Sequence, residues 1–396
     1  MEIVEDIVIA GAGLAGLTTA LGLHRLGIRS LVLESADGLR ATGFAITMWS
    51  NAWKALDAVG VGDTLRLKHK QFQRLVTHSL VSGEVSSELL VKGHEVRCLK
   101  RNFLMEALEQ ELPSGTIRFS SKVVSIEESG HFKLVHLADG TVIKTKVLIG
   151  CDGVNSVVAK WLGFNTPVFT GREAIRAYAD VKGGHGFGPE SFLCFGNGVR
   201  TGFVPCDDET VYWFLTYTPS SHDEDMQDNP AKLKQFALSK FGNLPDQLKS
   251  IVESTELDSI ITSPLRYRRP WELLWGNISI GNVCVAGDAL HPMTPDIGQG
   301  GCSALEDGVV LARCLAKALS KPGEEEWKRI EKGLENYAKE RRWRSFELIS
   351  TAYIVGTIQQ SSGKIMGFLR NKILSKFFGG LMFGKAGFDC GKLSVN

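Results

Sequence analysis

Apolar residues along this chain follow two different patterns, and the first is that of a short apolar strand followed by a helix. Residues 6–10 form such a strand and lead through glycines into a helical pattern that ends near Leu26. Three further segments repeat this order: 30–34; 95–99 with 102–108; and 283–286 with 303–313. Alternating strands and helices predict an α/β fold.

The second pattern, in residues 164–271, is typical of an antiparallel sheet. Strand-like runs there are separated by turn-forming residues at 196–198 and 206–209. These runs are 192–195, 200–204 and 211–217. Residues 71–91 are expected to add strands to the same sheet, and residues 230–241 are expected to form a helix. Residues 116–149 contain further strands, with a hairpin turn at Asp139-Gly140.

Because segments of the two patterns alternate along the chain, we predict a Rossmann-like dinucleotide-binding domain interleaved with an antiparallel-sheet substrate domain and followed by a C-terminal helical tail. The predicted boundaries are 1–70, 96–163 and 273–320 for the first domain, 71–95 and 164–272 for the second, and 321–396 for the tail.

The tail is predicted to contain a charged helix from Glu324 to about Ser350 and a basic amphipathic segment at 361–388. Such a segment suits a membrane surface, a cap on the substrate domain or a subunit interface. We favour the cap or the interface, and we expect a monomer or a homodimer.

Composition narrows the class of protein. With 396 residues, 43% of them apolar and 22% charged, the chain is typical of a soluble two-domain protein. A net charge of +1 gives no reason to expect nucleic acid binding. The eight cysteines include no C-x-x-C pair, which favours reduced, buried thiols over disulfides or a metal site. Since no membrane span, secretion signal or transit peptide is evident, we expect a cytoplasmic enzyme without a metal.

A glycine motif follows the first strand directly. In Gly11-x-Gly13-x-x-Gly16 the first glycine permits a tight turn, the second lets backbone approach a pyrophosphate, and the third allows close packing of helix on strand. The second strand ends at Glu34, about 20 residues on, where a carboxylate can bind the hydroxyls of an adenosine ribose. Together these residues predict a dinucleotide site.

Further contacts would lie outside this motif. Gly298, Gly300 and Gly301 expose backbone N–H groups at a helix start, which suits an anionic cofactor. Arg40 follows the second strand and Arg101 opens a helix, so either guanidinium is placed to meet a diphosphate. Each arginine also fits the alternative of an ordinary surface charge.

Three separated motifs resemble the class A flavin-dependent aromatic hydroxylases, the single-component FAD monooxygenases of the para-hydroxybenzoate hydroxylase type. They are Gly11 to Gly16 with Glu34, the strand end at Asp152-Gly153, and Gly287-Asp288 continuing into Pro295 and Gly298 to Gly301. The sequence is most similar to FAD-dependent urate hydroxylases and their plant homologues, and more distantly to zeaxanthin epoxidase.

The resemblance implies a Rossmann-like FAD-binding domain with non-covalent FAD and with NAD(P)H as a transient co-substrate. It places Asp288 on the ribityl chain, Pro295 at the isoalloxazine, and Asp152 and Gly153 near the pyrophosphates. It also assigns to the cofactor Ala15, Ser35 and Val124. The antiparallel sheet would cover the flavin, and the segment from Arg40 to Ala45 would lie where the isoalloxazine swings. Two positions depart from the family pattern, Lys160 in place of Arg and Gly308 in place of Ala; we interpret the second as a minor packing change.

The activity implied is hydroxylation or epoxidation of a small electron-rich aromatic or heteroaromatic substrate with O2, by way of a flavin C4a-hydroperoxide. Arg200, Tyr212 and Asp296 match the spacing of the urate hydroxylase substrate residues: Arg200 would stabilise an anionic substrate, and the other two would orient it and handle a proton. The alternative is structural, with Tyr212 in the core, Arg200 exposed and Asp296 capping a helix.

Two other classes of protein stay open. One is an FAD-dependent dehydrogenase or reductase without oxygen insertion, and the other is a non-enzymatic regulator that keeps the FAD fold. His291 is isolated, so contact with flavin or backbone is a better interpretation than metal ligation. Arg266 to Arg269 is interpreted as a solvated strand end.

Overall fold

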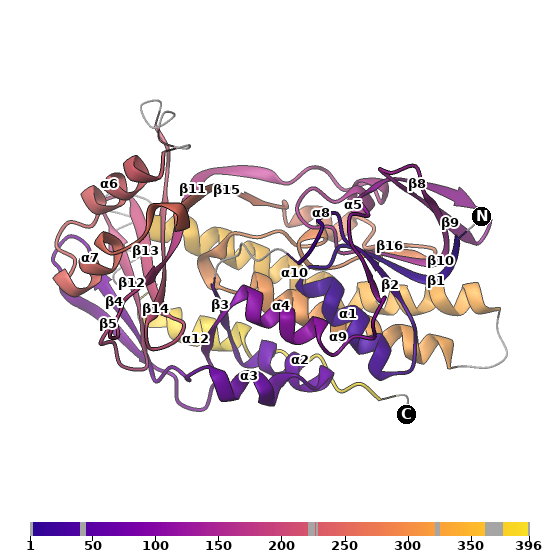
Figure 1. Ribbon diagram of the computed structural model, residues 1–396, viewed down its shortest axis with the longest axis horizontal. Coiled ribbons are helices and arrows are strands. Elements are labelled where there is room, and N and C mark those ends of the chain that lie inside the picture. Colours follow the sequence, from indigo (N-terminus) through magenta and orange to yellow (C-terminus); the bar gives the residue numbers. More distant parts are fainter. Residues whose placement is uncertain are drawn as a thin grey trace.

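Two large β-sheets lie at opposite ends of the long axis of the molecule, and one long helix connects them (Figure 1). The computed structural model describes residues 3–39, 45–220, 226, 229–320, 325–360 and 375–394. The long helix, α10 (Glu326–Gln360), contacts β16 and β17 of one sheet and β12 and β13 of the other. The predicted α/β fold with an inserted second sheet is confirmed.

The first sheet has eight strands in the order β16-β17-β10-β1-β2-β7, with β9 on β10 and β8 on β9. Its central pairs are parallel, and β9 and β16 join antiparallel. The strands are β1 (Ile3–Ala10), β2 (Leu31–Leu33), β7 (Ile117–Arg118), β8 (Val123–Ser129), β9 (Phe132–Leu137), β10 (Val142–Gly150), β16 (Ser279–Ile280) and β17 (Val283–Val285). Ile7 to Ala10 are all buried, as expected for a parallel strand with both faces covered.

Helices cover this sheet and build the segments around it. They are α1 (Leu14–Arg25), α2 (Ser50–Val59), α3 (Gly62–Lys68), α4 (Arg101–Glu109), α5 (Val157–Trp161), α8 (Trp271–Trp275) and α9 (Gly300–Leu319). Two strands, β3 (Ala45–Met48) and β6 (Arg97–Lys100), form a separate antiparallel pair.

Helices α1 and α9 approach each other unusually closely at Gly308. A Cβ atom there would lie 2.7 Å from Cβ and 2.8 Å from Cγ2 of Thr18, which is tighter than real Cβ contacts. The interpretation of Gly308 as a minor packing change was therefore wrong. A side chain at this position would force apart α1, which begins within the glycine motif, and α9, which follows the loop that ends at Gln299.

The second sheet has seven strands in the order β15-β11-β14-β13-β12-β4-β5. They are β4 (Arg74–Ser79), β5 (Val85–Leu90), β11 (Val168–Asp180), β12 (Glu190–Gly196), β13 (Val199–Pro205), β14 (Thr210–Tyr217) and β15 (Ile261–Tyr267). The expectation that residues 71–91 add strands is confirmed; β4 pairs with β12 in parallel and with its other neighbour, β5, antiparallel.

The two faces of this sheet have different roles because successive side chains of a strand alternate. Phe203, Trp213 and Leu215 are buried against α6 (Pro230–Lys240), α7 (Asp246–Glu253) and the short η2 (Leu257–Ser259). The opposite face carries Arg200, Tyr212 and Phe214 and borders a cavity. The sheet thus presents a polar and aromatic face toward the first domain.

The C-terminal tail folds back on both domains. Helix α10 continues past its predicted end near Ser350 because Ala352 and Val355 on its inner face are buried. Helix α12 (Ser375–Lys385) contacts β5 of the second sheet. Within the described residues no helix is long and apolar enough to span a membrane. The predicted domain boundaries stay predictions.

Candidate active site

The glycine motif forms a tight turn between β1 and α1. Gly11 has φ +101°, and a Cβ atom on it would lie 2.4 Å from the carbonyl oxygen of Cys151. A Cβ atom on Gly16 would lie 2.0 Å from the carbonyl oxygen of Gly11. Gly13 caps α1 and has open space where its Cβ atom would be. Only Gly13 therefore faces room for a ligand, while its two partners are needed for the turn itself.

A cavity of about 420 Å³ opens beside this turn. The predicted cofactor residues on its wall are Gly11, Gly13, Glu34, Ser35, Arg101, Asp152 and Gly153. Glu34 Oε2 accepts the backbone N–H of Ala12 at 2.8 Å, which holds the carboxylate against the glycine turn. Asp152 accepts the N–H of Val157 at 2.7 Å, and its burial raises the carboxyl pKa above the ordinary value.

Three described residues predicted to bind the cofactor, Ala15, Gly16 and Val124, are not on the wall of either cavity. Ala15 is buried in α1 and is not on the cavity wall. Val124 points outward with 45% of its surface exposed, whereas Val123 lines the cavity because the two residues face opposite sides of β8. Arg40 falls outside the described residues, as does most of the segment from Arg40 to Ala45.

A second cavity, of about 510 Å³, lies between the first domain and the seven-stranded sheet. The predicted residues on its wall are Asp288, Pro295, Asp296, Gly298, Gly300, Gly301, Arg200 and Tyr212. Arg101 lines both cavities, so its position joins the two spaces. Pro295 lies in η4 (Pro295–Ile297), and Gly298 follows it at φ +59°.

The residues around the two cavities fit FAD. The first offers an open helix N-terminus at Gly13 and a ribose-binding carboxylate at Glu34. The second offers Asp288, exposed in η3 (Gly287–Ala289), and the N-terminus of α9 at Gly300. Trp49 Nε1 is buried beside this cavity without a hydrogen-bond partner among the described residues. The carboxylates of Glu34 and Asp288 suit the hydroxyl groups at the two ends of FAD. The helix N-terminus at Gly13 offers N–H donors for the diphosphate between them.

A buried group of three charges lies at the second cavity, and two of its members, Arg200 and Asp296, are on the cavity wall. Arg172 of β11 donates to both carboxylate oxygens of Asp296, with Nη1 3.2 Å from Oδ1 and Nη2 2.7 Å from Oδ2. Arg200 of β13 is more distant, with Nη1 3.6 Å from Asp296 Oδ1. All three side chains are at most 9% exposed. Asp296 is thus an ion-pair partner of Arg172 rather than a helix cap, and Arg200 is buried rather than exposed.

The Arg200 guanidinium has N–H donors that are not used in hydrogen bonds within the described residues. Its Nε and Nη1 atoms lack hydrogen-bond partners among the described residues, and its guanidinium lies over the Phe214 ring at 4.8 Å. Burial lowers the pKa of Arg200, and Arg172 adds to this effect while Asp296 opposes it. Within the buried group of Arg172, Arg200 and Asp296, two cations and one anion leave one excess positive charge, which favours an anionic ligand at Arg200.

Tyr212 lies on β14 opposite Val204 of β13, the strand that carries Arg200, and is on the same cavity wall as Arg200. Burial raises the pKa of its phenol to about 12, so the hydroxyl is protonated at neutral pH. The structure therefore brings the three predicted substrate residues to one cavity. Their catalytic roles stay predictions.

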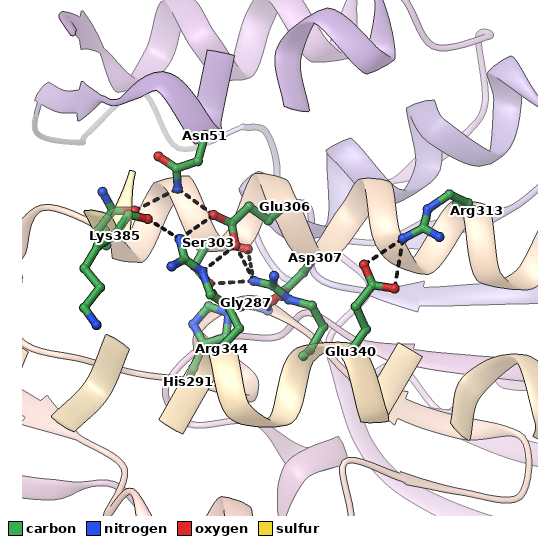
Figure 2. Close-up of polar contacts among 12 residues, drawn as sticks. Asn51, Gly287, His291, Ser303, Glu306, Asp307, Arg313, Glu340, Arg344 and Lys385 are labelled. Carbon is green, nitrogen blue, oxygen red and sulfur yellow. Dashed lines mark hydrogen bonds and ion pairs between the residues drawn. The ribbon is translucent and has the colours of Figure 1, made fainter. Parts of the chain in front are cut away.

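Beside the loop that connects β17 to α9, a buried polar network joins α2, α9 and α10 (Figure 2). Arg341 Nε donates to Asp307 at 2.5 Å, and Arg344 Nη2 donates to Glu306 at 2.8 Å. Asp307 also accepts the N–H of Gly287 at 2.7 Å, directly before Asp288. Burial acts to raise the carboxyl pKa values of Glu306 and Asp307, but the adjacent positive charges outweigh it and hold both below their ordinary values.

Two expectations from the sequence were wrong here. Arg268 is 2% exposed and donates to the carbonyls of Leu290 and Ala289, so the segment 266–269 is more than a solvated strand end. His291 Nε2 lies 2.6 Å from Asp307, so the expected contact with backbone was wrong, while contact with flavin stays a prediction. Both side chains hold the loop that follows β17.

Sequence reasoning missed the partners of the predicted residues. Glu306 and Asp307 did carry a signal, because two acids interrupt the apolar helix pattern of 303–313. Arg172, Arg341 and Arg344 carried none, since arginine is common on strand edges and helix surfaces. No group of histidine, cysteine, aspartate or glutamate among the described residues is placed to bind a metal.

Comparisons with known proteins agree with this site. A family described as FAD binding domain matches residues 5–352. Monooxygenase 2 of Arabidopsis thaliana is 56% identical over 400 residues, covering 98% of each chain. An FAD-dependent urate hydroxylase of Mycolicibacterium vanbaalenii is 28% identical and covers 77% of this chain and 78% of its own. The fold matches Klebsiella pneumoniae HpxO, complexed with FAD and uric acid, with a TM-score of 0.83 at 22% identity, covering 98% of both chains.

Together with these relatives, the fold and the joined cavities identify an FAD-dependent monooxygenase. The chain belongs to the FAD-binding-domain family, as a class A flavoprotein monooxygenase.

Replacing Gly13 by valine is expected to abolish FAD binding while leaving the fold intact. A Cβ atom at Gly13 meets nothing within 4 Å, so the branched side chain fits the protein but occupies the space of the pyrophosphate. The measurement is the flavin absorbance of purified protein, with the melting temperature of the apoprotein as control. A yellow Gly13→Val protein with normal FAD content would contradict the cofactor assignment.

Proposed function

We propose that the protein uses NAD(P)H, FAD and O2 to hydroxylate a small electron-rich aromatic or heteroaromatic compound that binds as an anion. The observation that carries this proposal is the excess positive charge of the buried group Arg172, Arg200 and Asp296, of which Arg200 and Asp296 line the second cavity. The uric acid held by the related fold of HpxO is a small heteroaromatic compound, which supports the substrate class.

The residues of this chain would act as follows. Arg200 donates its free N–H groups to an anionic oxygen of the substrate, which keeps electron density in the ring that is to be attacked. Tyr212, protonated at neutral pH, donates a hydrogen bond from the neighbouring strand. Bound FAD supplies the reducing electrons taken from NAD(P)H and the activated oxygen.

Asp296 has a different task from the one expected of it. Because both of its oxygens accept hydrogen bonds from Arg172, it is better placed to orient Arg200 than to take a proton from the substrate. The seven-stranded sheet and α12 cover the cavity, and exclusion of water protects reactive oxygen species from decay.

The test uses the purified holoenzyme and a panel of phenols, purines and indole-type heterocycles. NAD(P)H oxidation is expected to be slow alone and faster with a substrate, and the product is expected to carry one oxygen atom from labelled O2. The measurements are NAD(P)H absorbance, oxygen uptake and product mass. Substrate-dependent reduction of FAD without labelled product would instead identify a dehydrogenase, and no NAD(P)H oxidation with any ligand would indicate a non-enzymatic protein.

A further inference from the structure

Part of the substrate cavity is built by a segment that lies beyond the family match. The match ends at residue 352, whereas Gly379, Gly380 and Met382 of α12 line the second cavity. These residues lie on the wall that also includes Leu89 of β5 and Trp49. A wall made by a segment outside the shared domain is a natural place for substrate preference to differ between relatives.

Helix α12 is held in a defined position at its C-terminal end. The Lys385 carbonyl accepts a hydrogen bond from Arg344 Nη2 at 2.7 Å, and Arg344 is itself tied to Glu306 in the buried network (Figure 2). The Phe383 ring stacks on His94 with centroids 3.9 Å apart, and Met382 is 2% exposed. These contacts set which face of α12 meets the cavity.

Two adjacent glycines occupy the interior of α12, although glycine is among the least favourable residues inside a helix. Packing explains the first: a Cβ atom on Gly379 would lie 2.4 Å from Leu89 Cδ1. It does not explain the second, because a Cβ atom on Gly380 would meet nothing within 4 Å. Because Gly380 has no side chain, it leaves open space on the cavity wall.

The same cavity contains an independent sign of a ligand, the buried Arg200 guanidinium with its unpartnered Nε and Nη1 atoms. We propose that α12 is the specificity-determining wall of the substrate site, and that Gly380 admits the part of an aromatic anion that extends beyond the ring bound at Arg200. This inference rests on the proposed function, since it takes the ligand of Arg200 to be the substrate.

The test measures binding to the FAD-loaded protein and requires no turnover. Two probes share a carboxylate and a phenol but differ by one ring: 4-hydroxybenzoate and 6-hydroxy-2-naphthoate. Dissociation constants come from the change in flavin absorbance on titration. Gly380→Leu is expected to weaken binding of the naphthoate by about tenfold or more and to leave the benzoate within about twofold of wild type, because only the longer probe reaches position 380.

Gly384→Leu is the matched control. Gly384 is in the same helix and also has open space at its Cβ position, but it does not line the cavity, so neither probe should bind differently. Leucine favours a helix more than glycine does, so both variants should keep α12 folded. Gly380→Ala adds a smaller side chain and is expected to weaken the naphthoate less than Gly380→Leu does, which gives a graded result if the leucine variant is poorly soluble.

Unchanged naphthoate binding in Gly380→Leu would overturn the inference, and so would equal weakening of both probes. If neither probe perturbs the flavin of the wild-type protein, the cavity is not a site for aromatic anions and the inference falls together with that part of the proposed function. If the predicted binding pattern is found but no compound is oxygenated, the wall assignment stands and only the oxygenation proposal fails.

Discussion

Replacing Arg341 by methionine is expected to destabilise the protein by about 3–5 kcal/mol and to loosen FAD. Arg341 is fully buried and pairs with Glu306 at 2.8 Å and with Asp307 at 2.5 Å, so its loss strips both buried carboxylates of a positive partner. FAD is affected because Asp307 holds the N–H of Gly287, next to the predicted ribityl contact Asp288. The measurements are the unfolding free energy in urea and the FAD content after dialysis.

Arg313→Met is the control for this experiment, because Arg313 and Glu340 join the same two helices, α9 and α10 (Figure 2). Their side chains are 31% and 32% exposed, so the loss should be at most about 1 kcal/mol. Equal destabilisation by the two substitutions would show that burial of the network is not what makes Arg341 important.

Replacing Arg172 by methionine is expected to uncouple NAD(P)H oxidation from product formation and to raise the KM for substrate by about 10–100-fold, with FAD still bound. Without Arg172 both oxygens of Asp296 lose their hydrogen bonds, and the carboxylate can turn to the nearby Arg200. The pocket then has no excess positive charge for an anionic substrate. Product yield per NAD(P)H oxidised, together with flavin absorbance, measures the effect.

Two further variants separate the charge of Arg172 from its geometry. Arg172→Lys keeps the cation but loses the two-pronged contact, so an intermediate product yield is expected. Gly356→Ala keeps both charged residues but puts a Cβ atom of α10 2.1 Å from Asp296 Oδ2 and 2.6 Å from Arg172 Nη2, which must displace the pair. Normal coupling in both Arg172→Met and Gly356→Ala would remove the Arg172–Asp296 pair from the mechanism.

The cofactor site could be predicted in large part because its signals are local. Gly11 and Gly16 adopt their roles through contacts within one strand–turn–helix unit and its neighbouring strand, and Glu34 reaches that turn from the adjacent strand. The resemblance to urate hydroxylases likewise selected Arg200 and Tyr212, and the structure has both on one face of a sheet. The resemblance did not tell which of two adjacent residues of β8 faces the cavity, so Val124 was expected where Val123 lines it.

The residues that set charge in the substrate cavity could not be found in this way. Arg172 and Asp296 are 124 positions apart and meet only when the irregular part of β11 between Phe169 and Glu173 packs against the loop that connects β17 to α9. Gly356 looks like an ordinary helix interruption until α10 is seen to press against that pair. Helix periodicity near 350 likewise gave too early an end for α10, because burial against both domains extends the helix to Gln360.

The sequence by itself determined the family, the FAD-binding motifs and the division into two interleaved sheets, since each depends on short contiguous patterns of glycine, apolar residues and turns. Only the tertiary structure decided which charges are paired and what closes the substrate cavity. An ion pair such as Arg341–Asp307, or a wall such as α12, exists because folding brings distant segments into a dry contact where unpaired charge is costly. No local pattern records such a contact.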